Sequence, residues 1–239
     1  MTENLPANPF GTGVALTNAA AMADAITGSA SRGALGAAPE GSVYVNFSGK
    51  RGCYEFGPDK GNIDTSEIWL VNIASFEDGY VCWKGGASVA TRMANIYQNQ
   101  LIPVPAADEL GPFEVQKGEG WFNAKAMVIK SVEEDERQGY FKINSKSGVS
   151  AFADLQTQVA ERLRAGRPSW PLVNLGKEEF TAKGFKNSKP KIDVYGWLSD
   201  AAVQELASDP DADIDALIGS SEAPTQAALP AGRRRRATL

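Results

Sequence analysis

The chain has 239 residues, of which 43% are hydrophobic and 22% are charged, which is enough material for one sizeable core. It contains no histidine, which excludes a Ser-His-Asp triad, a Cys-His catalytic pair and a histidine-bound metal. The formal net charge of −5 argues against nucleic-acid binding only at first sight, because the acidic excess lies in the first 40 and the last 40 residues and the chain between them is neutral.

The N-terminal part of the chain predicts a flexible arm followed by a β hairpin. Residues 1–40 are rich in Ala, Gly, Thr and Ser, bury too little apolar surface to offset their ordering entropy, and offer at most a short helix over residues 16–26. We expect a folded domain over residues 41–198. It starts with alternating strands over residues 42–47 and 53–56, joined by turn residues at 48–52.

Apolar runs in the middle of the chain predict several more strands. Two of them, over residues 68–73 and 80–84, are separated by a turn signal at 76–79. The proline-containing stretch 89–115 indicates a long excursion over the surface. The remaining strands are predicted over residues 121–132, 139–144, 172–180 and 191–198, with an acidic turn at 133–136 and a Lys-rich loop at 181–190.

One helix is predicted between the later strands. Apolar side chains recur at helical spacing over residues 149–165, at Phe152, Leu155, Val159 and Leu163. About seven strands with a helix inserted at this point are typical of an OB-like β-barrel. We therefore expect a mostly β fold, an OB-like β-barrel with one inserted helix, between disordered N- and C-terminal tails.

Residues 199–239 predict the disordered C-terminal tail. A short helix extends to about Leu206, and the acidic stretch Asp209–Asp215 is typical of a linker. The tail ends with four arginines, Arg233–Arg236. Both charge blocks are typical of segments that interact with a partner.

Residues 139–191 combine positive charge with aromatic rings, since they contain ten Lys or Arg against four Asp or Glu. A groove for single-stranded nucleic acid needs cations that follow the phosphates and rings on which bases stack, at about 1–3 kcal/mol per base. Strand alternation places Tyr140 and Lys142 on one face, which we assign to the groove together with Lys146. Phe141 and Ile143 fall on the core face. Solubilising lysines and core aromatics remain the alternative explanation.

Three turns add candidate nucleic-acid-binding residues. The Lys-rich loop is the sharpest, because lysines and a ring come together at one hairpin tip; the alternative is a solvated, mobile turn. Lys84 marks the exposed end of its strand, and Arg51 with Tyr54 at the first hairpin is a weaker candidate. The candidates in the Lys-rich loop are Lys183, Phe185, Lys186 and Lys189.

Nothing in the sequence indicates an enzyme. The acidic run 133–136 is typical of a solvated turn, and no Walker or dinucleotide motif is present. Ser145-Lys146-Ser147 lacks the other parts of a nucleophilic site. Cys53 and Cys82 lack the spacing of a zinc site, so we expect buried reduced thiols. We therefore predict no catalytic residue, no cofactor and no metal.

Three segments together resemble the second half of bacteriophage single-stranded DNA-binding proteins with OB folds. They are Gly139–Gly148, Pro171–Leu175 and Lys189–Leu198, and the likeness extends over residues 42–198, with residues 68–86 as a less specific match to the first half. The resemblance implies single-stranded DNA as the partner, and an acidic C-terminal tail that recruits replication or recombination proteins and competes with DNA. Asp209–Asp215 would match that tail, whereas the terminal arginines depart from it and put the competition in doubt.

The leading hypothesis is therefore sequence-tolerant single-stranded DNA binding in phage replication, recombination or repair. The alternatives are a protein–protein interaction module, such as a phage-encoded adaptor or inhibitor with no nucleic-acid binding, and a minor virion component. The N-terminus lacks a secretion signal and no segment is apolar enough to span a membrane, which predicts a cytoplasmic protein, in the host cytoplasm if the chain is phage-encoded.

Overall fold

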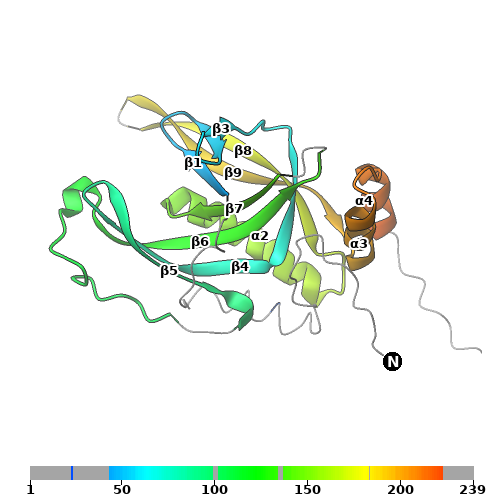
Figure 1. The fold of residues 1–239 in the computed structure, drawn as a ribbon, viewed down its shortest axis with the longest axis horizontal. Helices are drawn as coiled ribbons and strands as arrows, with labels where there is room; N and C mark the ends of the chain where they lie inside the picture. The colour runs from blue at the N-terminus through cyan, green and yellow to red at the C-terminus, as the bar shows by residue number, and fades with distance from the viewer. Residues whose placement is uncertain (1–22, 24–42, 99–101, 134–136, 183, 223–239) are drawn as a thin grey trace, which may run out of the picture.

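The chain is built around one curled β-sheet. The computed structural model describes residue 23 and residues 43–98, 102–133, 137–182 and 184–222. Within these residues, nine strands form the sheet and three α-helices pack against it (Figure 1). The expectation of a mostly β fold is therefore confirmed.

Strands dominate the first part of the described chain, and two of the three helices follow the last strand. The strands are β1 (Tyr44–Ser48), β2 (Cys53–Phe56), β3 (Gly61–Asn62), β4 (Ile68–Lys84), β5 (Ala87–Asn95), β6 (Gly120–Ser131), β7 (Gln138–Ile143), β8 (Trp170–Ala182) and β9 (Phe185–Leu198). The helices are α2 (Lys146–Arg164), α3 (Asp200–Ser208) and α4 (Ile214–Glu222), with short 3₁₀ turns at η2 (Ile96–Gln98) and η3 (Val115–Lys117).

The sheet is mostly antiparallel and open at its two ends. Its strand order is β3-β2-β1-β7-β6-β4-β8-β9, and β5 pairs with β4 beside this path. β1 pairs with β7 in parallel, and the other pairings of described strands are antiparallel. No strand pairing among the described residues joins β3 to β9, so hydrogen bonds do not close the curled sheet into a full barrel.

β4 is the long central strand, and a bulge lets its two halves pair with different neighbours. The first half pairs with β8 and the second with β5, while the register with β6 shifts between Asn72 and Glu77. Side chains hold the bulge: Asn72 Oδ1 accepts from the Ala74 N–H at 3.1 Å, and Ser75 Oγ accepts from the Val128 N–H at 2.8 Å. The prediction of two strands separated by a turn at 76–79 is therefore wrong.

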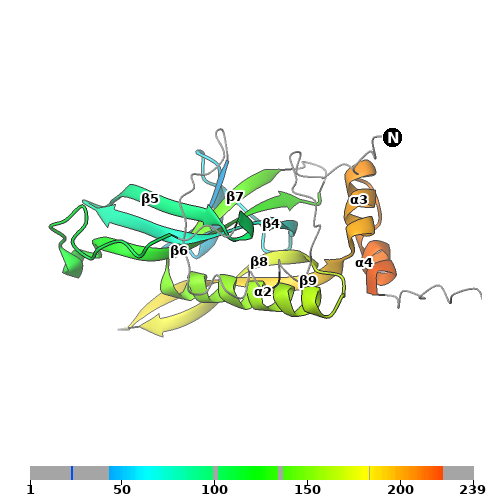
Figure 2. The same cartoon turned by 90° about the horizontal axis from the view of Figure 1, so that it is seen from below.

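Two ribbons extend past the core of the sheet, at the end opposite to α3 and α4 (Figure 1, Figure 2). One ribbon is formed by β4, β5 and β6, so the predicted excursion over 89–115 begins as a strand. The other is formed by β8 and β9, which pair from Trp170 opposite Leu198 to Ala182 opposite Phe185. The Lys-rich segment 181–190 is thus mostly strand, turning at Gly184, whose φ of 81° favours glycine.

α2 covers one face of the sheet and completes the main core, as Figure 2 shows. Its Phe152 ring packs against Phe76 at 5.7 Å and Phe141 at 6.5 Å between centroids. A buried ion pair joins the same layers, because Lys125 Nζ donates to Asp78 Oδ1 at 2.7 Å and to the Gln156 side chain of α2 at 2.8 Å. The helix predicted over 149–165 is confirmed, and it begins slightly earlier, at Lys146.

Two helices follow the predicted domain boundary at residue 198. Leu206 of α3 and Leu217 of α4 are buried against the main core, and Ser199 caps α3 by accepting from the Ala202 N–H. The acidic stretch Asp209–Asp215 is accordingly not a disordered linker: it forms the exposed connection between these helices and the start of α4. Residues 223–239, with the terminal arginines, lie outside the described residues.

The predicted N-terminal arm is described at one residue only. Ala23 is helical and fully buried, and its carbonyl oxygen accepts from Arg164 Nη2 of α2 at 3.2 Å. The rest of the arm, including most of the predicted helix over 16–26, lies outside the described residues. The same holds for residues 134–136 of the acidic turn predicted at 133–136.

Candidate nucleic-acid interface

The turn of the first hairpin meets the β8–β9 ribbon at Ser188 and Lys177. We define the basic arm as the β1–β2 turn, Gly49–Gly52, together with the ribbon residues Gly176–Lys191. A Cβ added at Gly52 would lie 2.6 Å from Ser188 Oγ and 3.7 Å from Lys177 Nζ, so the turn touches the ribbon and requires a glycine at this point. The structure therefore brings two predicted basic segments, far apart in sequence, side by side. Strand alternation places Lys177 and Lys186 on the ribbon face that meets the turn, and Lys189 and Lys191 on the opposite face.

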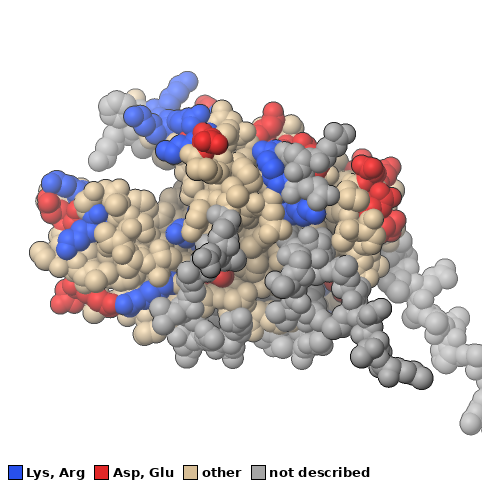
Figure 3. Space-filling view, viewed as in Figure 1, with Lys and Arg blue, Asp and Glu red and all other residues tan. Residues whose placement is uncertain are grey.

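The basic arm carries an excess of positive charge that is partly balanced by carboxylates. Figure 3 shows these Lys and Arg side chains gathered at one corner of the molecule, with a few acidic groups between them. The six described cations and the four carboxylates near them leave a local excess of two positive charges. The cations are Lys50, Arg51, Lys177, Lys186, Lys189 and Lys191, and the carboxylates are Glu55, Glu178, Glu179 and Asp193.

The ion pairs of the basic arm lie at the surface, except that Arg51 contacts a buried carboxylate, Glu55. Arg51 contacts Glu55 at 2.8 Å, Lys189 contacts Glu178 at 2.8 Å, Lys191 contacts Asp193 at 2.5 Å and Lys177 contacts Glu179 at 3.9 Å. Exposed pairs of this kind contribute only about 0–1 kcal/mol each, so a phosphate group competes readily for the same cations. Lys50 and Lys186 make no ion pair with a described residue and are exposed.

One exposed ring accompanies the basic arm. Phe180 of β8 is 43% exposed and lies opposite Asn187, two residues along the ribbon from the pairing of Lys189 with Glu178. Strand alternation places Phe180 and Lys189 on the same face of the ribbon. Lys183 and the side chain of Phe185 lie outside the described residues, so their predicted roles stay predictions. Phe180 was missed as a site residue because its strand was expected to end there.

Tyr54 is not a stacking residue, contrary to the prediction. Its side chain is 1% exposed and its ring packs edge-on against Phe47 and Phe141. The hydroxyl donates to the Lys191 carbonyl oxygen of β9 at 2.9 Å, and burial raises the pKa of this phenol well above its usual value. Tyr54 therefore ties β2 to β9 beneath the basic arm and helps to fix the position of the arm.

Tyr140 also differs from its predicted role. Phe141 and Ile143 face the core as expected, and Tyr140 lies on the opposite face, but its side chain is only 3% exposed. Its hydroxyl donates to Glu77 Oε2 at 2.5 Å. Its ring packs with apolar side chains from three other strands, Val81, Met93, Ala124 and Ala126. The ring is therefore not available to a base.

Lys142 lies next to a ring that was not among the predicted site residues. Its Nζ is 5.7 Å from the centroid of the Tyr44 ring, which meets Tyr140 edge-on at 5.8 Å between centroids. Tyr44 is 42% exposed. Alternation in the first strand indicates an exposed Tyr44 beside a buried Val45, but only the parallel pairing of β1 with β7 brings Tyr44 to Lys142.

Burial shifts the ionisation of the polar groups on this outer face. It raises the pKa of Glu77, although the Tyr140 hydrogen bond and the charge of Lys142 oppose the rise. It lowers the pKa of Lys142, although the charge of Glu77 opposes the fall. The pKa of Tyr140 is raised by burial and by the neighbouring carboxylate.

Lys84 is separate from the basic arm and contacts the loop before η3, so its predicted role stays a prediction. It lies at the tip of the β4–β5–β6 ribbon, where Nζ donates to the carbonyl oxygens of Leu110 at 2.8 Å and Gly111 at 3.3 Å and lies 5.8 Å from the centre of the Phe113 ring. Lys146 is exposed at the first position of α2 and makes no ion pair with a described residue.

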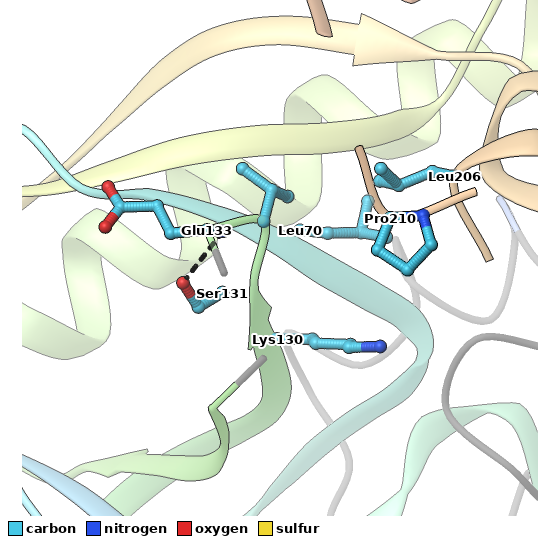
Figure 4. A pocket seen from close by; sticks show the side chains of 7 residues that line it. Leu70, Lys130, Ser131, Glu133, Leu206 and Pro210 are labelled. Atoms are coloured by element: carbon cyan, nitrogen blue, oxygen red, sulfur yellow. Dashed lines mark hydrogen bonds between the residues drawn. The ribbon is translucent and has the colours of Figure 1, made fainter. Parts of the chain in front are cut away.

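A recess beside β6 and α3 is too small to be a ligand site. Figure 4 shows its lining, which includes Leu70, Lys130, Leu206 and Pro210. Its volume of about 20 Å³ holds roughly one water molecule, against about 300 Å³ or more for a typical ligand pocket. Within the described part of the chain, no group of three or more His, Cys, Asp or Glu side chains is arranged to hold a metal ion.

Comparisons with known proteins identify no relative of this chain, so its functional assignment depends on the geometry described above. No helix among the described residues is long and apolar enough to cross a membrane. The chain matches no protein-family model, and no curated protein and no solved structure matches it.

Proposed function

We propose that the chain is a sequence-tolerant single-stranded DNA-binding protein that holds the phosphate backbone on its basic arm. The observation that carries the proposal is the close approach of Gly52 to Ser188, where an added Cβ would lie 2.6 Å from the serine Oγ, which brings the Lys50–Arg51 turn beside the β8–β9 ribbon. Cations clustered in this way release counterions when they bind phosphates, and this release supplies affinity without reading sequence. No chemistry is done on the DNA.

The order of the strands supports an OB-like interpretation of the sheet. β4, β6 and β7 precede α2, and β8 and β9 follow it, so the helix lies between the third and fourth strands of a five-stranded unit. β4 pairs with both β6 and β8, and the β1–β2 hairpin lies between β7 and β9. OB folds bind oligonucleotides with the loop between their last two strands, and the tip of the β8–β9 ribbon has that position.

The biological setting is part of the same proposal. The resemblance of residues 42–198 to bacteriophage single-stranded DNA-binding proteins implies a role in phage replication, recombination or repair, in the host cytoplasm. The acidic segment Asp209–Asp215, which recruits replication or recombination proteins in this proposal, is exposed between α3 and α4.

Charge reversal in the basic arm tests the proposal. Lys186→Glu with Lys189→Glu should weaken binding of a labelled oligo(dT) by about tenfold or more in fluorescence anisotropy, because two phosphate contacts become repulsive. The matched control is Lys117→Glu with Arg167→Glu, which changes the net charge equally at exposed positions outside the arm. Equal losses in both variants, or no binding by the unmodified chain, would refute the proposal.

A protein-interaction module is the second candidate, and exposed apolar side chains on the β4–β5–β6 ribbon and its connecting loop favour it. Most of the exposed large hydrophobic side chains of the described residues lie there: Val89, Val104, Leu110, Val115 and Phe122. This alternative expects a partner that is captured equally by the Lys186→Glu, Lys189→Glu variant and lost on Leu110→Ser with Val115→Ser. It also expects no retention of the chain on single-stranded DNA cellulose.

A further inference from the structure

Tyr44 and Lys142 form a ring and cation pair on the outer face of the sheet, away from the main core. Tyr44 lies directly opposite Tyr140 in the parallel pairing of β1 with β7, and Lys142 follows Tyr140 by two residues on the same face. The Tyr140 ring meets the Tyr44 ring edge-on, at an interplanar angle of 89°. This contact with a buried ring restricts the orientation of the Tyr44 ring.

The ammonium group of Lys142 has no acceptor among the described residues. It lies over the Tyr44 ring and makes neither a hydrogen bond nor an ion pair with a described residue. Glu77 interacts with it electrostatically, but no hydrogen bond or ion pair joins the two side chains, and Glu77 Oε2 accepts from the Tyr140 hydroxyl. A half-buried ammonium with three unused donors is poised to take an acceptor from outside the chain, and a phosphate oxygen is the strongest common choice.

We propose that Tyr44 and Lys142 form a nucleotide subsite in which one base stacks on the exposed ring of Tyr44 and the adjoining phosphate accepts from Lys142. The subsite rests on the proposed function, and it assigns phosphate binding and base stacking to different residues. The cations of the basic arm bind phosphates, whereas the Tyr44 ring binds a base face of any identity. Tyr44 belongs to the additional first hairpin, outside the five strands of the OB-like unit.

Two ligands of equal length separate stacking from charge: oligo(dT), and the corresponding abasic oligonucleotide, which keeps the phosphates. Tyr44→Ala should weaken oligo(dT) binding by about 5- to 150-fold and leave binding of the abasic strand unchanged, because only the base contact is lost. Tyr44→Phe should bind both strands as the unmodified chain does. Lys142→Met should weaken both, because its contact is with phosphate.

The outcomes also distinguish this inference from the function on which it rests. If the chain binds oligo(dT) and loses affinity on Lys186→Glu with Lys189→Glu but not on Tyr44→Ala, the subsite is refuted and the function stands. If the unmodified chain does not bind oligo(dT), both fail. Tyr44→Trp gives an independent readout, since stacking of a base should quench the fluorescence of the introduced indole. Unchanged emission from that indole at saturating oligo(dT) would contradict stacking there.

Discussion

Two tyrosine hydroxyl groups act as fixed ties between strands. Tyr54 donates to the Lys191 carbonyl oxygen, and Tyr140 donates to Glu77. A buried ring whose hydroxyl has a partner is held in place, so neither ring is free to stack on a base. Alternation in the sequence places Tyr140 on the correct face, but its burial depends on side chains from β4, β5 and β6 that lie far away in the sequence.

Tyr54→Phe should lower the free energy of unfolding by about 1 kcal/mol, because the Lys191 carbonyl oxygen loses its buried donor. Urea denaturation measures this change. Oligo(dT) affinity should fall much less than in the Lys186→Glu, Lys189→Glu variant, since no cation is lost and the ring still packs against Phe47 and Phe141. A variant with normal stability and weakened DNA binding would instead place Tyr54 in the interface.

Glu77 should make stability depend on pH. Its pKa is raised by burial, so the folded state holds the proton more tightly than the unfolded state, and stability falls as the pH rises through the raised pKa. Glu77→Gln mimics the protonated form and can still accept from Tyr140. Urea denaturation across the acid to neutral range should therefore show the variant more stable than the unmodified chain at neutral pH, with the difference shrinking as the pH falls. Lys142 and Tyr140 are present in both proteins, so their ionisation does not contribute to the difference. A difference that does not vary with pH would therefore contradict a raised pKa for Glu77.

Elements whose pattern is local were predictable, and elements that depend on long-range pairing were not. The 3.6-residue spacing from Phe152 to Leu163 located α2, and alternating runs located β1, β2, β6 and β7. β4 was predicted as two strands because glycine, here Gly79, is typical of turns. Gly79 is required for another reason, since a Cβ there would lie 1.9 Å from the Arg92 carbonyl oxygen on β5.

The buried Lys125–Asp78 pair couples α2 to the sheet, and its loss should be costly. Lys125→Met leaves the Asp78 carboxylate buried without its cation and should lower the free energy of unfolding by about 3–5 kcal/mol. Adding Asp78→Asn removes the isolated charge and should recover part of that loss. Chemical denaturation of the single and double variants checks this, and equal losses in both would show that the charge is not the cause.

The docking of α4 is testable at Leu217, which is 4% exposed. Leu217→Ala should lower the free energy of unfolding by about 2–5 kcal/mol, because it leaves a cavity against the core. Val115→Ala, at a position that is 77% exposed, is the matched control and should change stability by at most about 0.5 kcal/mol. Similar small effects at both positions would show that α4 does not dock on the core, as expected for a disordered tail.

For the whole molecule, the net charge of −5 hides an uneven distribution. Residues 200–222 carry seven carboxylates and no Lys or Arg, and Figure 3 shows acidic side chains gathered over α3 and α4, away from the basic arm. The ten cations counted over residues 139–191 do not form one patch, because the arginines at the end of α2 contact other partners, such as Arg162 over the Trp197 ring at 4.4 Å. The basic arm instead includes the Lys50–Arg51 turn, which lies beside the β8–β9 ribbon. No sequence pattern indicates that these two segments come together.

The salt dependence of oligonucleotide binding tests the central claim most directly. Anisotropy titrations of oligo(dT) at several salt concentrations should give a linear fall of log K with log salt, with a slope of about −0.7 for each phosphate contact. Lys186→Ala with Lys189→Ala should reduce the size of that slope by about 1.4, two contacts fewer, while Lys117→Ala leaves it unchanged. Binding that does not change with salt, or a slope that is the same in all three proteins, would contradict a phosphate-binding basic arm.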